Sequence, residues 1–206
     1  MSFMKKLSAL SLASAALCSP FLSSNTNAEE YNKGFYASIG IGSGTYSDLI
    51  LAGTVFSLPF EAGFSYDGSF GYDFGKRFRV DLSYANTTST VSTGNEAVFG
   101  SVIFNGYIDF PIKDSKWEPF VGLGYGSTNV DATNLCTVGG ADVCEDDVAT
   151  FSVSGGVNYS LSPDLDLTGK VTYLGFDTIY VRDNNVLVTV TESETVAAHV
   201  GLKFKF

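Results

Sequence analysis

The sequence predicts an all-β fold, specifically an eight-stranded antiparallel up-and-down transmembrane β-barrel. Three observations predict it. Apolar and polar side chains alternate with a period of two, and the connections alternate between short turns and long loops. The composition, 45% hydrophobic, 14% aromatic and 17% charged with 22 glycines among 206 residues, is typical of β-structure. Only a closed barrel satisfies every backbone polar group of a sheet inside lipid.

Residues 1–28 have the pattern of a secretory signal peptide. Basic residues near the start precede an uncharged run of Leu, Ala and Ser over residues 7–22, and small residues lead to a cleavage site after Ala28. A membrane anchor is the alternative, but the apolar run is short and is interrupted by serines and Pro20. We expect residues 29–206 to form one barrel domain.

The first four expected strands each place apolar side chains on one face, because successive residues of a strand point to opposite faces. In the third, polar or small residues such as Arg79 and Asp81 separate the apolar ones. The apolar sets are Phe35, Ala37, Ile39 and Ile41 in 35–42; Phe64, Tyr66, Phe70, Tyr72 and Phe74 in 64–74; Phe78, Val80, Leu82 and Tyr84 in 78–85; and Val98, Val102, Phe104, Ile108 and Phe110 in 98–110.

The last four expected strands continue this alternation to the C-terminus. Glycines fill the alternate positions in one of them, and Ser, Thr, Asn, Asp and Lys fill them in the others. The apolar sets are Val121, Leu123 and Tyr125 in 121–126; Phe151, Val153, Val157, Tyr159 and Leu161 in 151–161; Leu165, Leu167, Val171 and Tyr173 in 165–173; and Val196, Ala198, Val200, Leu202, Phe204 and Phe206 in 196–206.

The connections divide into two kinds. Short turns are expected at 75–77, 112–116 and 162–164, and longer surface loops at 44–56, 86–95, 127–148 and 177–190. Short turns on one side and long loops on the other are typical of a barrel in the outer membrane. A soluble barrel of the lipocalin kind is the alternative, but such a barrel points its apolar face inward. The charged and polar face of this chain would be a poor lining for a pocket that binds an apolar ligand.

The polar face carries charges that we expect to form a network in the lumen. An eight-stranded barrel is only wide enough to be filled by side chains, and unpaired charges there would be costly. We therefore hypothesise that these charges pair and plug the lumen; the alternative is a gated polar path, which would make the barrel a narrow porin-like channel for small solutes. The network comprises Asp73, Arg79, Asp81, Asp109, Asp166, Lys170, His199 and Lys203, with Lys205 beside it.

The loop at 127–148 holds a cysteine pair. Because an exported chain meets an oxidising compartment, we predict a Cys136–Cys144 disulfide. Two cysteines with no histidine near them do not make a zinc site. The acidic residues around the pair present a solvated surface or a weak site for Ca²⁺ or Mg²⁺, and the sequence leaves this open.

The first long connection is apolar where a surface loop is normally polar. An exposed apolar patch marks an interaction site, and its ligand would be an apolar molecule, a lipid or a partner protein. The alternative is that two strands extend here and fold over the barrel mouth. The patch comprises Leu49, Ile50, Leu51, Val55 and Phe56.

Several function classes are disfavoured. The 12 basic residues against 22 acidic ones, net charge −10, exclude the basic surface that nucleic acid requires. The sequence lacks His-Glu-x-x-His, Gly-x-Ser-x-Gly and a complete dinucleotide fingerprint, so we expect neither an enzyme nor a cofactor. His199, the single histidine, is expected to be a hydrogen-bonded interior residue.

Four short motifs resemble the small outer-membrane β-barrel family related to the OmpA transmembrane domain and the opacity-type surface proteins. They are Val80–Tyr84, Glu118–Gly126, Leu165–Leu167 and Val200–Phe206. The resemblance implies a barrel in outer-membrane lipid, with Phe206 in the C-terminal signal read by the barrel-assembly machinery. Related barrels serve as pores, adhesins, surface antigens and structural proteins, so family membership does not fix function. We expect a non-enzymatic structural or surface-interaction role in the cell envelope, with a narrow porin-like channel as the alternative, and the surface ligand or host or cell partner of the loops stays open. No periplasmic domain is expected.

Overall fold

A computed structural model describes most of the expected barrel domain. The described residues are 33–46, 49–50, 57–58, 60–75, 77–91, 96–131, 145–177, 179–183, 186–190 and 194–206. The predicted signal peptide, residues 1–28, lies outside them. Within the described ranges, no helix is long and apolar enough to span a membrane.

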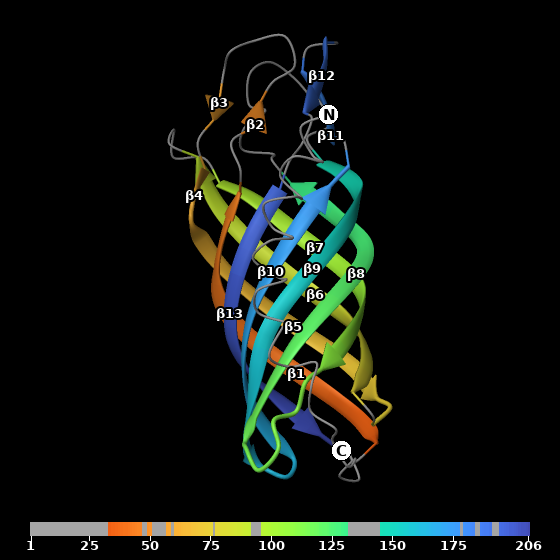
Figure 1. The fold of residues 1–206 in the computed structure, drawn as a ribbon. Coiled ribbons are helices and arrows are strands. Elements are labelled where there is room, and N and C mark those ends of the chain that lie inside the picture. Colours follow the sequence, from red (N-terminus) through yellow and green to blue (C-terminus); the bar gives the residue numbers. More distant parts are fainter. Residues whose placement is uncertain are drawn as a thin grey trace. The chain divides into compact units, whose positions relative to one another are not determined.

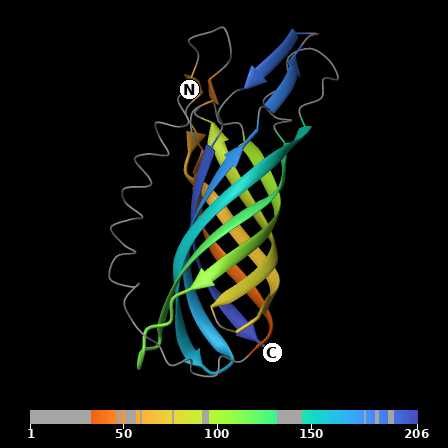
Figure 2. The same ribbon diagram turned by 45° about the vertical axis from the view of Figure 1, so that its right-hand side comes forward.

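Eight long strands form one closed antiparallel barrel (Figures 1 and 2). Each pairs with its neighbour in sequence, and the last pairs with the first, with Ile41 opposite Val200. The prediction of an eight-stranded up-and-down barrel is therefore confirmed. The strands are β1 (Gly34–Tyr46), β5 (Gly63–Asp73), β6 (Phe78–Val91), β7 (Glu96–Asp109), β8 (Trp117–Asp131), β9 (Glu145–Ser162), β10 (Leu165–Phe176) and β13 (Glu194–Lys205).

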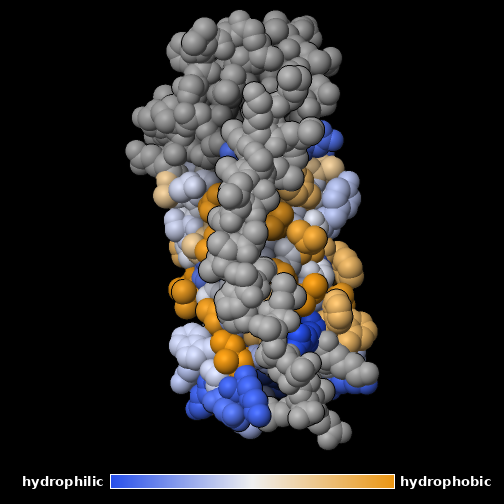
Figure 3. Space-filling model, in the orientation of Figure 1, coloured by the Kyte–Doolittle hydropathy of each residue, from blue (hydrophilic) through white to orange (hydrophobic). Residues whose placement is uncertain are grey.

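The apolar face of every long strand points outward. Ile39, Leu123 and Tyr125 are 64%, 68% and 67% exposed, whereas the alternate positions are largely buried. On the face drawn in Figure 3, apolar residues lie over the middle of the barrel and hydrophilic residues at its lower end. This arrangement inverts a soluble barrel and suits a surface that faces lipid.

The three short connections lie where they were predicted. Phe74 N donates a hydrogen bond to Phe78 O at 2.9 Å, which closes the β5–β6 turn, and Gly75 there adopts a φ of 67°. This left-handed conformation suits glycine because it has no Cβ to clash with the backbone. We call the end of the barrel that carries these turns the short-turn end, and the opposite end the long-loop end.

The predicted long loops include residues that belong to strands, because the strands continue past the end of the apolar pattern. β6 runs to Val91 although its loop was expected from residue 86, and Thr90 still pairs with Glu96 of β7. The segments 127–131 and 145–148 likewise belong to β8 and β9. Residues 86–89 are polar on both faces, so the alternation stops there while the backbone hydrogen bonds continue.

Two of the remaining long connections contain short strands. In the predicted 177–190 loop, β11 (Ile179–Asp183) pairs with β12 (Val186–Val190). In the first connection, β2 (Leu49–Ile50) pairs with β3 (Ser57–Leu58), and β4 (Phe60–Glu61) pairs with β6. The backbone of Leu49 and Ile50 is therefore in a hairpin, whereas Leu51, Val55 and Phe56 of the apolar patch lie outside the described residues.

Candidate functional site: the barrel lumen

All eight charged or titratable positions predicted for the lumen network lie on the inner face of the barrel. Arg79, Asp109 and Lys203 are each at most 5% exposed. Asp73, near the short-turn end, is half-buried and accepts a hydrogen bond from Gly75 N at 2.8 Å. The alternation of the strands places these residues inside, but their partners differ along the barrel axis.

Arg79 forms the centre of a packed layer near the short-turn end. Its Nε lies 3.0 Å from both carboxylate oxygens of Asp109. Its guanidinium carbon lies 4.1 Å from the centre of the Tyr107 ring, 4.6 Å from that of Phe120 and 5.7 Å from that of Tyr36. We call these five residues the arginine layer. Cation–π contact and a buried ion pair hold the guanidinium in place.

Glycines make room for the three rings of the arginine layer. Tyr107 is paired with Gly122, Phe120 with Gly156 and Tyr36 with Gly71 on the neighbouring strands. A Cβ built on any of these glycines would overlap the facing ring. The glycines therefore leave the space that the three rings occupy beside Arg79.

Asp81 continues the layer without an ion pair of its own among the described contacts. It accepts hydrogen bonds from Tyr36 Oη at 3.0 Å and from Asn105 Nδ2 at 2.8 Å. Asn105 Oδ1 in turn accepts a hydrogen bond from Ser152 Oγ at 3.0 Å. The chain of contacts links β1, β6, β7 and β9 across the lumen, so it ties together strands that are not all neighbours in the sheet.

A second ionic cluster lies at the short-turn end. Lys203 Nζ is 3.0 Å and Lys205 Nζ 2.9 Å from Asp166 Oδ2, and Lys203 is 3.9 Å from Glu118. Asn158 Nδ2 donates to Glu118 at 3.1 Å. The two lysines thus share one nearly buried carboxylate, and Glu118 adds negative charge beside them.

The long-loop half of the lumen is lined mainly by hydroxyl groups. Ser101 and Thr128 lie 2.8 Å apart, and Thr150 donates to Thr128 at 2.7 Å. Ser65 Oγ lies 2.8 Å from both Thr87 Oγ1 and His199 Nε2. We call these six residues the hydroxyl layer.

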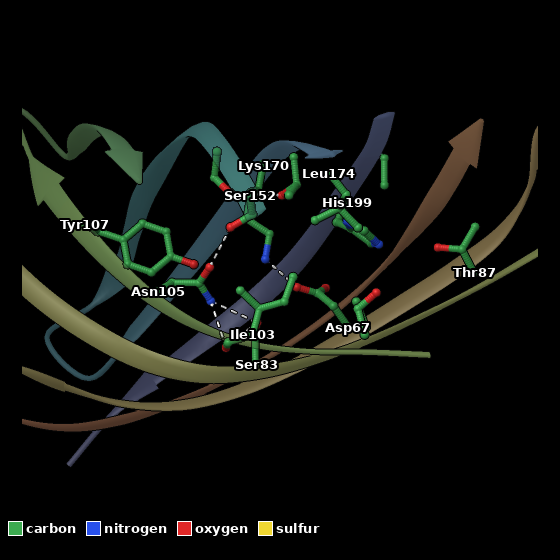
Figure 4. A pocket seen from close by; sticks show the side chains of 15 residues that line it. Asp67, Ser83, Thr87, Ile103, Asn105, Tyr107, Ser152, Lys170, Leu174 and His199 are labelled. Atoms are coloured by element: carbon green, nitrogen blue, oxygen red, sulfur yellow. Dashed lines mark hydrogen bonds and ion pairs between the residues drawn. The ribbon is translucent and has the colours of Figure 1, made fainter. Parts of the chain in front are cut away.

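One ion pair crosses between the two halves. Lys170 of β10 pairs with Asp67 of β5, two strands that are not neighbours in the sheet. Figure 4 shows both side chains pointing into the same cavity, with His199 beside them and Asn105 on the opposite wall. Lys203 of β13, 3.9 Å from Glu118 of β8, also reaches a carboxylate on a strand that is not its neighbour.

Two separate cavities lie among the described residues of the barrel. The one in Figure 4 has a volume of about 30 Å³ and lies between the hydroxyl and arginine layers, which is room for about one water molecule. The other, about 310 Å³, opens at the short-turn end and is lined by Tyr36, Lys203 and Lys205 among others. They share no lining residue, and Arg79 and Phe120 line neither.

The sequence matches the family model of the outer membrane protein beta-barrel domain over residues 14–206. The chain belongs to that family. Its location is therefore the outer membrane, with the short-turn end facing the periplasm and the long-loop end facing the cell surface. Among curated proteins, no relative matches the sequence.

Solved outer-membrane barrels have the same fold. Neisserial surface protein A superposes with a TM-score of 0.62 at 21% identity, over 85% of this chain and 99% of that one. OprG from Pseudomonas aeruginosa gives 0.60 at 16%, over 87% and 98%. AlkL in lipid bilayers gives 0.54 at 16%, over 89% and 95%.

In this outer membrane protein beta-barrel, several lumen residues were missing from the predicted network. Asp67 and Glu118 share the inward parity of the predicted charges, so the alternation could have included them. Tyr36, Tyr107 and Phe120 are large residues on the polar face, and pairing each with a glycine across the strand would have been the signal. In the described part of the chain, no group of acidic, His or Cys side chains could hold a metal ion.

The other predicted sites lie at the edges of the described structure. Phe206 follows β13, is 77% exposed, and its backbone N donates to Phe35 O at 2.9 Å. Cys136 and Cys144 lie outside the described residues, so their disulfide stays a prediction. Asp142, between them in the sequence, also lies outside the described residues, whereas Asp131 ends β8 and Glu145, Asp146 and Asp147 begin β9.

Proposed function

We propose that this protein serves the outer membrane as a structural or surface-interaction barrel with a closed lumen. The observation that carries the proposal is the arginine layer between the two cavities: Tyr107 lines one cavity and Tyr36 the other, whereas Arg79, Asp109 and Phe120 line neither. An ion passing through would have to displace Arg79 from Asp109. Separating such a buried pair costs about 3–5 kcal/mol, so the closed state dominates.

The working surface in this proposal is the long-loop end. The sequence there carries the apolar patch around Ile50 and Phe56 and the predicted Cys136–Cys144 bridge. A patch of this kind suits an apolar ligand or a partner protein. If it binds, Ile50→Asp and Phe56→Ser should reduce the binding of hydrophobic probes to the folded protein, whereas unchanged binding would favour a lid over the barrel mouth.

Catalysis is not part of the proposed function. Ser65 Oγ and His199 Nε2 lie 2.8 Å apart in the lumen, but the adjoining cavity of about 30 Å³ has no room for a lipid or a peptide. A general base must reach its substrate. The pair therefore suits an interior hydrogen bond.

A narrow channel for small solutes is the second candidate. The observation that favours it is that polar cavities lie on both sides of a single layer, so movement of one side chain would connect them. The acidic chain would then draw cations in preference to anions.

Biogenesis implies one further partner, the barrel-assembly machinery. The outward alternation of Val200, Leu202, Phe204 and Phe206 matches the C-terminal pattern of assembled barrels. Deleting Phe206 should lower the amount of folded protein in the outer membrane, and an unchanged amount would remove this partner from the proposal.

Single-channel recording separates the two candidate functions. The chain without residues 1–28 is refolded into lipid, its folding is checked by heat-dependent gel mobility, and current is recorded across a planar bilayer. Silence from folded protein supports the closed structural barrel. Discrete, salt-dependent steps would overturn it and establish the channel.

A further inference from the structure

The two ends of the barrel carry opposite charge. The sequence of the short turns is rich in cations: Lys76, Arg77, Lys113 and Lys116 stand beside Asp114 and Asp164. At and beyond the long-loop ends of the eight long strands, the sequence has one cation, Arg182. The acidic residues there are Asp48, Glu61, Glu96, Asp131, Asp142, Glu145, Asp146, Asp147, Asp177, Asp183, Glu192 and Glu194. An anionic partner is therefore attracted to the periplasmic end and repelled from the cell-surface end.

One periplasmic turn combines this charge with aromatic rings on the lipid-facing surface. Trp117 of β8 and Tyr159 of β9 are paired across the strands, with ring centres 4.7 Å apart. Both have outward parity, and Trp117 is 50% exposed. Lys116 Nζ lies 5.9 Å from the centre of the Tyr159 ring, within the range of a cation–π contact.

Backbone contacts fix the position of this turn against the barrel. Ser160 N donates to Lys116 O at 2.9 Å, Ser115 N donates to Ile112 O at 3.1 Å, and Trp117 N donates to Ser115 Oγ at 3.2 Å. Lys113 is exposed at the tip. The two lysines outnumber the one acidic residue of the turn, Asp114.

We propose that Lys113, Lys116, Trp117 and Tyr159 form a binding site for the headgroup of an anionic phospholipid in the periplasmic leaflet. The occupant is a lipid because the two rings lie at the edge of the apolar band, where Trp and Tyr place an apolar body in lipid and a polar tip at the headgroups. The exposed side chain of Ile112 extends this apolar surface. The lysines then meet the phosphate, and the indole N–H supplies a further donor.

The test uses Trp117, the single tryptophan of the chain, as a local reporter. The protein without residues 1–28 is refolded into phosphatidylcholine vesicles in which either brominated phosphatidylglycerol or brominated phosphatidylcholine is varied. Bromine quenches a tryptophan that it touches. We expect phosphatidylglycerol to associate more strongly by roughly fivefold for each lysine engaged, with the preference falling at high salt.

Two variants locate the effect. Lys116→Gln and Lys113→Gln should each lower the preference by roughly fivefold. Lys33→Gln is the matched control, because Lys33 lines the periplasmic cavity at the start of β1 and lies off the Trp117 turn, so its preference should stay as in the parent protein. Folding of each variant is checked by heat-dependent gel mobility.

Identical quenching by the two brominated lipids would overturn the proposal. A preference for phosphatidylglycerol that stays unchanged in both Lys113→Gln and Lys116→Gln would also overturn it. So would a preference that Lys33→Gln lowers as much as those two variants do. If a variant does not fold, the salt dependence of the parent protein is the deciding measurement. A preference for phosphatidylglycerol that does not fall at high salt would contradict a charged headgroup site.

Discussion

The two halves of the lumen are built from different chemistry. The periplasmic half is filled by the arginine layer and the Lys203–Asp166 cluster, in which charges lie 2.9–3.0 Å apart. The half toward the cell surface is lined by the hydroxyl layer, in which Ser and Thr hydroxyls contact one another and His199. A cavity of about 310 Å³ opens at the periplasmic end, and the arginine layer separates it from the cavity of about 30 Å³ beside the hydroxyl layer.

This difference shows where the barrel resists opening. Hydroxyl contacts contribute about 1 kcal/mol each, and water can replace them. A guanidinium between a carboxylate and three rings has no such replacement, because removal of one partner leaves an uncompensated buried charge. The periplasmic half should therefore dominate both stability and closure.

Removing Arg79 should produce the largest effect. Arg79→Ala leaves Asp109 without its cation and the three rings without their central group, so we expect unfolding in lipid vesicles to become easier by about 3–5 kcal/mol. Urea titration of the refolded protein measures the change. Arg79→Met with Asp109→Asn should recover part of it; no recovery would mean that the ring contacts and not the charge carry the layer.

Breaking the ion pair between the halves should cost less. Lys170 side-chain exposure is 17% against 5% for Arg79, and the adjoining cavity admits water to Asp67. We expect Lys170→Met to destabilise the barrel by about 1.5–3 kcal/mol in the same titration. A loss as large as that of Arg79→Ala would show that the two halves do not differ.

Filling the space beside a ring should disturb the arginine layer alone. Gly122→Ala places a Cβ against Tyr107, so we expect about 1–3 kcal/mol of destabilisation from overpacking. Gly106→Ala is the matched control, because nothing lies within 4 Å of the added Cβ, and its effect should stay within about 0.5 kcal/mol. Equal effects would argue against the glycine–ring fit.

The smallest effect is expected in the hydroxyl layer. Thr128→Val keeps the shape of the side chain but removes the contacts to Ser101 and Thr150, at a cost of about 1 kcal/mol. Urea titration again gives the value. A cost above about 3 kcal/mol would place the hydroxyl layer on a par with the arginine layer and remove the contrast between the halves.

The sequence was sufficient to predict the barrel and the inward side of each strand. Period-two alternation decides the face, so residues such as Arg79, Asp81 and Lys170 could be placed inside without knowing the register. Strand ends could not be placed by the same signal. The pairing of β6 with β7 extends to Thr90 and Glu96. It depends on backbone hydrogen bonds, which continue where the apolar pattern has stopped.

The partners within the lumen could not be predicted, because they depend on register and on position around the barrel. Arg79 and Asp109 meet since β6 and β7 are neighbours, whereas Lys170 reaches Asp67 across the lumen from β10 to β5. Tyr107 reaches Arg79 only because Gly122 leaves space beside it. A search for aromatic residues on the polar face that are paired with a glycine on the neighbouring strand would have identified the arginine layer.

The most direct test of the closed periplasmic half is a comparison of single-channel currents from the parent protein, Arg79→Ala and Lys170→Met, each shown to be folded. We expect the parent protein and Lys170→Met to be silent and Arg79→Ala to give discrete, salt-dependent steps, because only the last joins the two cavities. Steps from Lys170→Met with silence from Arg79→Ala, or steps from the parent protein, would contradict closure by the arginine layer.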